Sequence, residues 1–114
     1  MAAIRGVSLA MFLGMVVYTV AVGQTHGWDF VSPFLSDLGA VNWSGQFNAD
    51  FGCYLVVSTV WFLWRNEFTG ASLVTAPLIL TGGMLVFSVY LFYLTFRVDG
   101  RIDVLLLGAG RVGR

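Results

Sequence analysis

The sequence predicts an all-α integral membrane protein with three transmembrane helices and a short interfacial helix in the first loop. Three stretches, roughly residues 4 to 23, 47 to 64 and 73 to 96, are apolar and almost free of charge. Crossing the hydrocarbon core of a bilayer takes about 20 apolar residues, and backbone that faces lipid in so short a chain has to be helical. The composition agrees, with 58% hydrophobic residues, 11% charged residues and a mean hydropathy of +0.84.

We divide the chain into a three-helix transmembrane domain, residues 1–97, and a short C-terminal tail, residues 98–114. The apolar run after Arg5 is longer than the hydrophobic part of a typical signal peptide, so we expect it to be retained as a helix. The net charge is zero and no basic patch stands out, which argues against nucleic-acid binding. A single cysteine, Cys53, excludes a disulfide framework within the chain.

Small residues recur along the predicted helices at spacings that let a second helix approach closely. The predicted packing positions are Gly6, Ala10 and Gly14 in the first helix, Ala49 and Cys53, which continue from Gly45, in the second, and Gly82 and Gly83 in the third. They serve either packing within the bundle, which is the more frequent use, or a dedicated dimer face.

The first loop contains the predicted interfacial helix. From Ser32 to Gly39, serine suits the N-cap, Pro33 the first helical position and glycine the residue after the helix. Its apolar residues share one face, so the helix would lie flat on the membrane surface. Tryptophans are expected at headgroup depth, Trp28 and Trp43 on the loop side and Trp61 and Trp64 on the opposite side.

The second helix is expected to begin near Ser44, with Asp50 in its first turns. The helix dipole favours a carboxylate there, although an ionisable group within a span is also a functional candidate. Pro77 either opens the third helix or kinks it one turn in. Aromatic side chains in the second half of that helix could contact lipid, a neighbouring subunit, or a flat cofactor such as a chlorin or a quinone.

The arginines give conflicting indications of orientation. Three straight spans place Arg5 and Arg65 on one side, and Arg97, Arg101, Arg111 and Arg114 on the other together with the first loop. This count favours a cytoplasmic C-terminal side. The first helix favours a cytoplasmic N-terminus, because Arg5 precedes it and an acidic loop follows it. We adopt the second orientation, with the loop outside.

The tail carries one familiar motif. Residues Ile102 to Leu107 read as a short strand, and Gly108, Gly110 and Gly113 have the G-x-G-x-x-G spacing of dinucleotide-binding folds. That fingerprint works only inside a βαβ unit, and the sequence up to Arg114 holds neither a second strand nor a ribose-binding acid. We therefore expect no dinucleotide to bind.

The sequence offers no catalytic constellation, and we expect no enzyme. His26 is the only histidine, and beside a helix end it could be an axial ligand of haem or of a chlorin magnesium, or simply form interfacial hydrogen bonds. Together with Gln24, Asp29 and Asp37 it matches no metal-ligand spacing. No ionisable residue lies near the centre of a predicted span, which argues against ion-coupled transport by one chain. The cofactor stays open.

The first loop and the second helix carry a pattern found elsewhere. It consists of Leu35-Ser36-Asp37-Leu38-Gly39 followed by Phe47-Asn48 and Gly52. Over roughly residues 5 to 96 the chain resembles the N-terminal half of the uncharacterised bacterial and archaeal membrane family DUF998. It is also similar to the Frag1/DRAM/Sfk1 group, whose first loop has an S-D-x-G stretch. The resemblance implies a bacterial inner (cytoplasmic) membrane location. It marks Ser36, Asp37, Gly39 and Asn48, with Asp50 beside them, as the loop motif to test.

Two classes of function fit these features. The first is a small accessory or structural subunit of a larger membrane complex, such as a photosynthetic or respiratory one, with the lipid bilayer and other membrane subunits as partners. The second is a homo-oligomeric ligand-binding or transport-related module, in which His26, Asp37, Asn48 and Asp50 line a polar pocket beneath the loop helix. We favour the first, because the chain is small, has packing faces and lacks catalytic groups.

Overall fold

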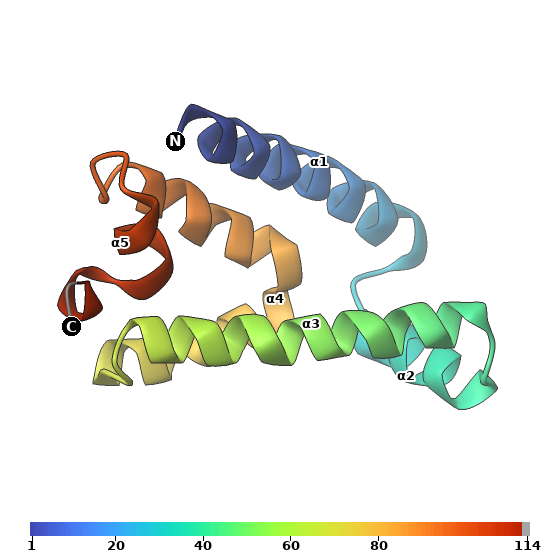
Figure 1. Cartoon of the computed structure of the whole chain (residues 1–114). Coiled ribbons are helices and arrows are strands. Elements are labelled where there is room, and N and C mark those ends of the chain that lie inside the picture. The colour runs from blue at the N-terminus through green and yellow to red at the C-terminus, as the bar shows by residue number, and fades with distance from the viewer. Residues whose placement is uncertain (113–114) are drawn as a thin grey trace.

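The structure is a computed structural model that describes residues 1–112, and every regular element in that range is helical. The elements are α1 (Ala2–His26), α2 (Val31–Ala40), α3 (Trp43–Arg65), α4 (Gly70–Thr95), α5 (Ile102–Leu107) and the 3₁₀ turn η1 (Ala109–Arg111) (Figure 1). Gly113, the last glycine of the G-x-G-x-x-G pattern, and Arg114 lie outside the described residues. The all-helical prediction is confirmed, and the short helix expected in the first loop is present as α2.

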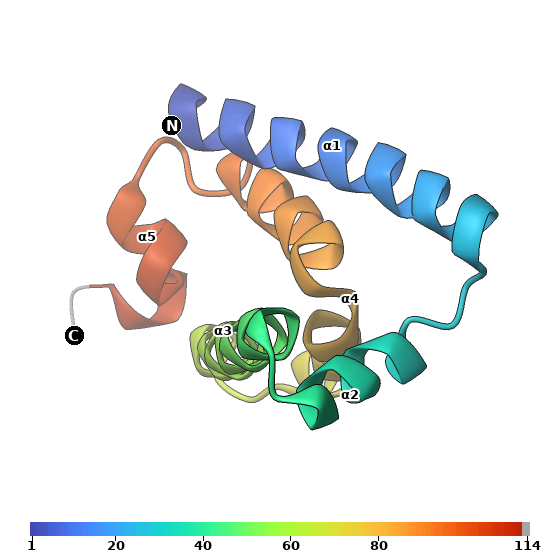
Figure 2. The ribbon, with the colours of Figure 1, turned by 90° about the vertical axis from the view of Figure 1, so that its right-hand side faces the viewer.

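Two long helices, α1 and α3, run in broadly opposite directions along the molecule (Figure 1). Their 25 and 23 residues correspond to lengths of about 37 and 35 Å. The other helices pack on this frame. α4 lies between α1 and α3 and contacts both, while α2 packs against the beginning of α3 (Figure 2).

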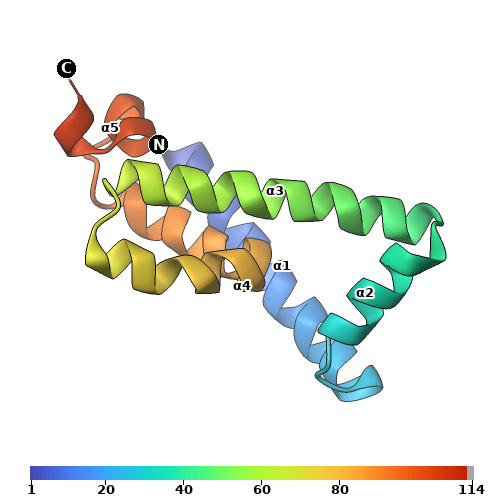
Figure 3. The ribbon, with the colours of Figure 1, turned by 90° about the horizontal axis from the view of Figure 1, so that it is seen from below.

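Gly83 breaks α4 into two segments, residues 70–82 and 84–95. Its backbone angles, φ 58° and ψ −144°, belong to a region that is populated almost only by glycine. The second segment folds back beside the first, so that α4 forms a V and returns toward the end where it began (Figures 1 and 3). Pro77 lies inside the first segment, so the prediction that it opens this helix is wrong, and the break falls at Gly83, six residues after the proline.

Side-chain contacts confirm the reversal of α4. Asn66 precedes the first segment, yet its Nδ2 donates a hydrogen bond of 2.9 Å to the phenol oxygen of Tyr90 in the second segment. In a straight helix Tyr90 would lie about 30 Å beyond Gly70. The N-terminus and α5 consequently meet at one end of the molecule, where three straight spans would place them at opposite ends (Figure 1).

Two helices of the described chain, α1 and α4, are long and apolar enough to cross a membrane, so the prediction of three spans is not confirmed. α3 has the length, but its first half carries Gln46, Asn48 and Asp50. The break at Gly83 also means that α4 is not one continuous straight span. The two segments of α4 are about 20 and 18 Å long, and each is shorter than the ~30 Å hydrocarbon core.

Most of the surface of these two apolar helices is not buried within the chain. Only 11% of the most apolar window of α1 and 28% of that of α4 are buried within the chain. Large side chains such as Val17 and Val74 are 70% and 80% exposed. Exposed apolar surface of this extent is typical of proteins that contact lipid or other protein chains.

The helix beginnings differ from those predicted. The N-cap position of α2 is Phe30, not Ser32, and the capping oxygen comes from the residue before it: Asp29 Oδ1 accepts the backbone N–H groups of Val31 and Ser32 at 3.2 and 3.1 Å. Asn42, not Ser44, caps α3, through a 2.8 Å hydrogen bond from the N–H of Gly45. In both places an Asn or Asp two or three residues upstream supplies the oxygen that satisfies the free N–H groups.

The core lies at the end where the N-terminus and α5 meet, and α5 is part of it. Leu94, Val98 and Leu105 form a buried cluster, with Met1 packed against it. The prediction of a strand over residues 102–107 is wrong, because this segment is the helix α5. A short apolar run fits either structure by its pattern alone.

Candidate functional site

The described arginines gather at one end of the molecule, which we call the arginine end. There the first turn of α1, the last residue of α3, the segment between α4 and α5, and η1 come together (Figure 1). The residues concerned are Arg5, Arg65, Arg97, Arg101 and Arg111. The opposite end, which we call the loop end, is formed by the turn from α1 to α2, by α2 itself and by the beginning of α3.

Arg65 joins three elements at the arginine end. Its Nε and Nη2 donate to the carbonyl oxygens of Leu105 and Val104 at 2.6 and 3.1 Å, and its Nη1 donates to the phenol of Tyr90 at 3.2 Å. These carbonyls lie in the C-terminal half of α5, where the helix dipole favours a cation. The Val104 carbonyl also accepts the backbone N–H of Gly108 at 2.8 Å. Arg65 therefore holds α5 against α3 and the second segment of α4.

Two further arginines cap helix ends in the same way. Arg5 donates to the Oγ1 and the carbonyl oxygen of Thr95, at 3.1 and 3.0 Å, and lies 3.9 Å from the centre of the Phe96 ring. Arg111 donates to the carbonyl of Trp64 at 3.0 Å and lies 4.1 Å from the centre of that indole. The cation–π contacts reinforce the hydrogen bonds. The C-terminal ends of α3, α4 and α5 are thus each capped by an arginine from another element.

Arg97 differs from these three arginines. It is exposed, its side chain forms no hydrogen bond or ion pair with the described residues, and its guanidinium lies 5.6 Å from the centre of the Tyr93 ring. Arg101 pairs with Asp103 at 2.6 Å on the surface, and this pair lowers the pKa of the Asp103 carboxyl. The arginine end therefore combines guanidinium groups that hold helices together with one whose donors remain available.

The charges separate along the molecule although the chain as a whole has no net charge. The arginine end carries five described arginines against three carboxylates, Glu67, Asp99 and Asp103, which gives a net charge of +2. The loop end carries no arginine and three carboxylates, which gives −3. Those three carboxylates are Asp29, Asp37 and Asp50.

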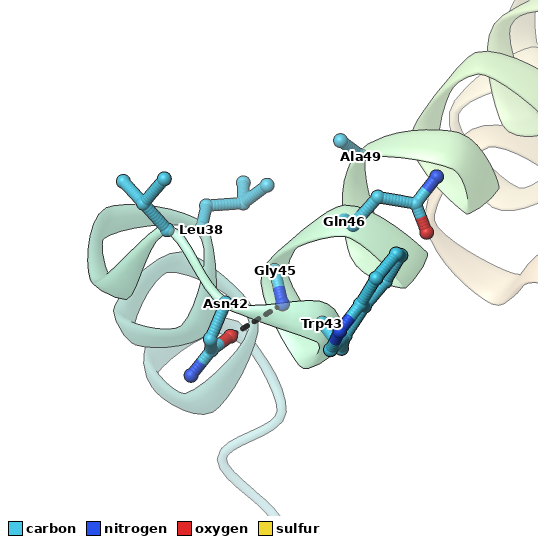
Figure 4. A pocket seen from close by; sticks show the side chains of 7 residues that line it. Leu38, Asn42, Trp43, Gly45, Gln46 and Ala49 are labelled. Atoms are coloured by element: carbon cyan, nitrogen blue, oxygen red, sulfur yellow. Dashed lines mark hydrogen bonds between the residues drawn. The ribbon is translucent and has the colours of Figure 1, made fainter.

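At the loop end α2 lies directly on the first turn of α3. Gly45 is buried against the carbonyl of Asp37, where a Cβ atom would have no room. Asn48 donates from Nδ2 to the carbonyl of Phe34 at 3.3 Å. The turn between the helices borders an open, mostly apolar hollow, with Leu38, Trp43 and Ala49 around it (Figure 4).

His26, the candidate cofactor ligand, lies in a different hollow at the end of α1, together with Trp28 and Asp29. Its side chain is exposed. Hydrogen bonds from the side chain and backbone of Ser32, with a smaller one from the backbone of Val31, lower the pKa of the Asp29 carboxyl. That carboxylate is engaged as the cap of α2. Among residues 1–112 no group of three histidine, cysteine or acidic residues could hold a metal ion.

The structure does not bring the predicted pocket residues together. Asp37 and Asn48 contribute to the contact between α2 and α3, whereas Asp50 is exposed on α3 and lines neither hollow. Ser36 and Gly39 are exposed on α2. His26 lies in a hollow of its own. The four residues of the predicted polar pocket therefore do not line a common cavity among the hollows described.

The predicted packing positions fall into two groups. Gly6, Ala10 and Gly14 are exposed on α1, and a Cβ atom at either glycine would meet nothing within 4 Å; Ala49 and Cys53 are also exposed. Gly83 instead packs closely, since a Cβ atom there would lie 2.9 Å from the ring of Phe51 in α3. Gly82 lies under Val86, one turn farther along the chain.

The sequence analysis missed the residues that close the V of α4, namely Asn66, Tyr90 and Thr95. The adjacent glycines Gly82 and Gly83 in an otherwise strongly helical run were the only signal of the break. The structure gives a reason for glycine at position 108 that is unrelated to the G-x-G-x-x-G pattern. Gly108 has a φ of +84°, and a Cβ atom there would lie 2.9 Å from the carbonyl oxygen of Arg65.

Comparison of this chain with models of known protein families, with curated proteins and with solved structures gave no match. No family is therefore identified for it, and the likeness of its first loop to known membrane families stays a prediction.

Proposed function

We propose that this chain is a small integral membrane protein of the bacterial cytoplasmic membrane that serves as an accessory subunit of a larger complex of unlike membrane chains, energy-converting complexes included. The observation that carries the proposal is the uncovered surface of α1. This helix is among the most apolar segments of the chain, yet only 11% of its most apolar window is buried. Lipid and partner helices are the surroundings in which such a surface is stable.

The spacing of the tryptophans supports a membrane location. Trp43 and Trp64 lie near the two ends of α3 and are separated by about 31 Å of helix. This matches the ~30 Å hydrocarbon core, at whose borders tryptophan is enriched. The polar first half of α3 is partly covered, because Asn48 bonds to the backbone of α2. We therefore include α3 among the proposed spanning helices.

The small residues of α1 are placed to receive a partner helix. Ser8 is buried on the side of α1 that faces inward, at 1% exposure. At 100° per residue, Gly6, Ala10 and Gly14 lie on roughly the opposite side of the helix. Their row is therefore open to the outside, where a helix of another chain could approach the backbone closely.

The alternative, a homo-oligomeric binding or transport module, is favoured less. It needs His26, Asp37, Asn48 and Asp50 around one cavity, and the chain distributes these residues over separate surfaces.

Purification in a mild detergent, with mass spectrometry and an absorbance spectrum of the same fraction, tests the proposal. Unlike chains in fixed ratio are the expected result, and a homo-oligomer without other subunits contradicts it. Gly14→Leu should reduce copurification of those chains. Leu9→Phe is the matched control, because it enlarges an exposed side chain about 140° from Gly14 around the same helix. Equal copurification of both variants would disprove a partner at the glycine row.

A further inference from the structure

We propose that the arginine end faces the cytoplasmic leaflet and binds the headgroups of anionic phospholipids. Both termini of the described chain then lie on that side, and α4 is a re-entrant hairpin that enters and leaves the membrane there. This inference rests on the membrane location proposed above. It assigns a ligand class and an orientation that the accessory role does not require.

The re-entrant path follows from the break at Gly83. The apex of the V lies beside Phe51 and Leu55, close to the middle of α3, so each segment of α4 reaches about halfway across the proposed membrane. Broken helices are tolerated at membrane depth only where protein covers the irregular backbone. Gly83 meets this condition, because it is buried against α3.

The fold-back changes the distribution of positive charge between the two membrane surfaces. Three straight spans divide the arginines between both surfaces, whereas the V brings all five described arginines to one end and leaves the loop end with aspartates alone. Arginine is enriched on cytoplasmic segments next to transmembrane helices, and the anionic lipids of that leaflet attract it. The tertiary fold therefore removes the conflict seen in the sequence.

Arg97 is the residue best placed to contact a headgroup. Three of the other arginines donate hydrogen bonds to helix carbonyls, namely Arg5, Arg65 and Arg111, and the fourth, Arg101, is paired with Asp103. Arg97 keeps its donors free of the described residues, beside the exposed rings of Tyr93 and Phe96. An aromatic surface next to a free guanidinium suits the interface between hydrocarbon and phosphate.

Cysteine labelling tests the topology in a simple background, because Cys53→Ser removes the only thiol. Single cysteines are introduced by Ala2→Cys, Val41→Cys and Asp99→Cys, and sealed vesicles of both orientations are treated with a membrane-impermeant maleimide. We expect positions 2 and 99 to react from the cytoplasmic side and position 41 from the other. Reaction of 2 and 99 from opposite sides would show that α4 crosses, and would overturn the inference while leaving the membrane location intact. Release of the protein by alkaline carbonate would instead refute the membrane location itself.

The binding of anionic phospholipid is tested by measuring which lipids the purified protein retains. The protein is reconstituted into nanodiscs of phosphatidylcholine and phosphatidylglycerol, re-extracted in detergent, and analysed for bound lipid. We expect wild type to enrich phosphatidylglycerol, Arg97→Gln to lower that enrichment about twofold or more, and Arg97→Lys to preserve most of it, since the attraction is to positive charge at the surface. No enrichment by wild type, or equal enrichment by Arg97→Gln, would disprove anionic lipid binding at this end.

Discussion

The phenol oxygen of Tyr90 accepts a 2.9 Å hydrogen bond from Asn66 Nδ2, which ties the returning segment of α4 to the turn before its outgoing segment. Arg65 donates to the same oxygen, and the ring of Phe62 lies 4.8 Å from that of Tyr90 in an edge-to-face arrangement. One aromatic side chain of the second segment of α4 therefore joins this segment to α3 and to the turn that precedes the first segment. The V depends on this group of contacts as well as on the break at Gly83.

Replacing Tyr90 by phenylalanine should destabilise the protein by about 1–2 kcal/mol. The substitution keeps the ring contact with Phe62 but leaves donors of Asn66 and Arg65 without their acceptor, and a half-buried donor without a partner costs about that much. Thermal unfolding in detergent measures the effect. Tyr54→Phe is the control, because Tyr54 is 69% exposed. An equal melting temperature for both variants would contradict a structural role of the Tyr90 hydroxyl.

Alanine at the two kinds of glycine should act in opposite directions. At Gly83 alanine has to adopt a glycine conformation and meets the Phe51 ring, so we expect a loss of about 2 kcal/mol or more. At Gly6, inside α1 with open space around it, alanine should instead gain up to about 1 kcal/mol of helix stability. Thermal unfolding followed by circular dichroism measures both. A Gly83→Ala variant as stable as wild type would mean that α4 does not need its break.

Removal of the Arg65 guanidinium should release α5. Arg65→Met removes the guanidinium hydrogen bonds to the carbonyls of Val104 and Leu105, and each charge-assisted hydrogen bond contributes about 1.5–3 kcal/mol. Proteinase K should therefore cut between residues 98 and 112 faster in this variant. Arg97→Gln is the control, because Arg97 holds no helix end. Cleavage at the wild-type rate would show that the core cluster around Leu105 suffices to hold the tail.

Acid should weaken the beginning of α2. Hydrogen bonds from Ser32 lower the pKa of Asp29 from its ordinary value of 3.8, so the ionised cap contributes stability above that value. The contribution is lost as the pH falls through the lowered pKa of the folded state. Ser32→Ala should move the pKa of Asp29 back toward 3.8, which a carboxyl NMR titration measures. An unchanged titration of Asp29 in this variant would show that the Ser32 hydroxyl contributes nothing.

Helix content and helix position were predictable from local properties of the chain. The apolar runs at 4–23, 47–64 and 73–96 fall within or nearly within α1, α3 and α4, and the serine–proline segment of the first loop became α2. Length, apolar composition and capping residues act over a few neighbouring positions, and the amino-acid order records them directly. The length and apolar composition of α1 and α4, which would allow each to cross a membrane, were visible in the same way.

The path of α4 after Gly83 was not predictable, because contacts between distant residues set it. Adjacent glycines at 82 and 83 fit a thin packing face as well as a break, and the break is realised where the Phe51 ring covers Gly83 and Asn66 reaches Tyr90. The same applies to residues 102–107, whose short apolar run becomes a helix where Arg65 meets its last carbonyls and Leu105 joins Leu94 and Val98. At both places the local sequence pattern fits two conformations, and the one observed is the one that contacts between distant residues stabilise. The observed conformations gather the described arginines at one end of the molecule.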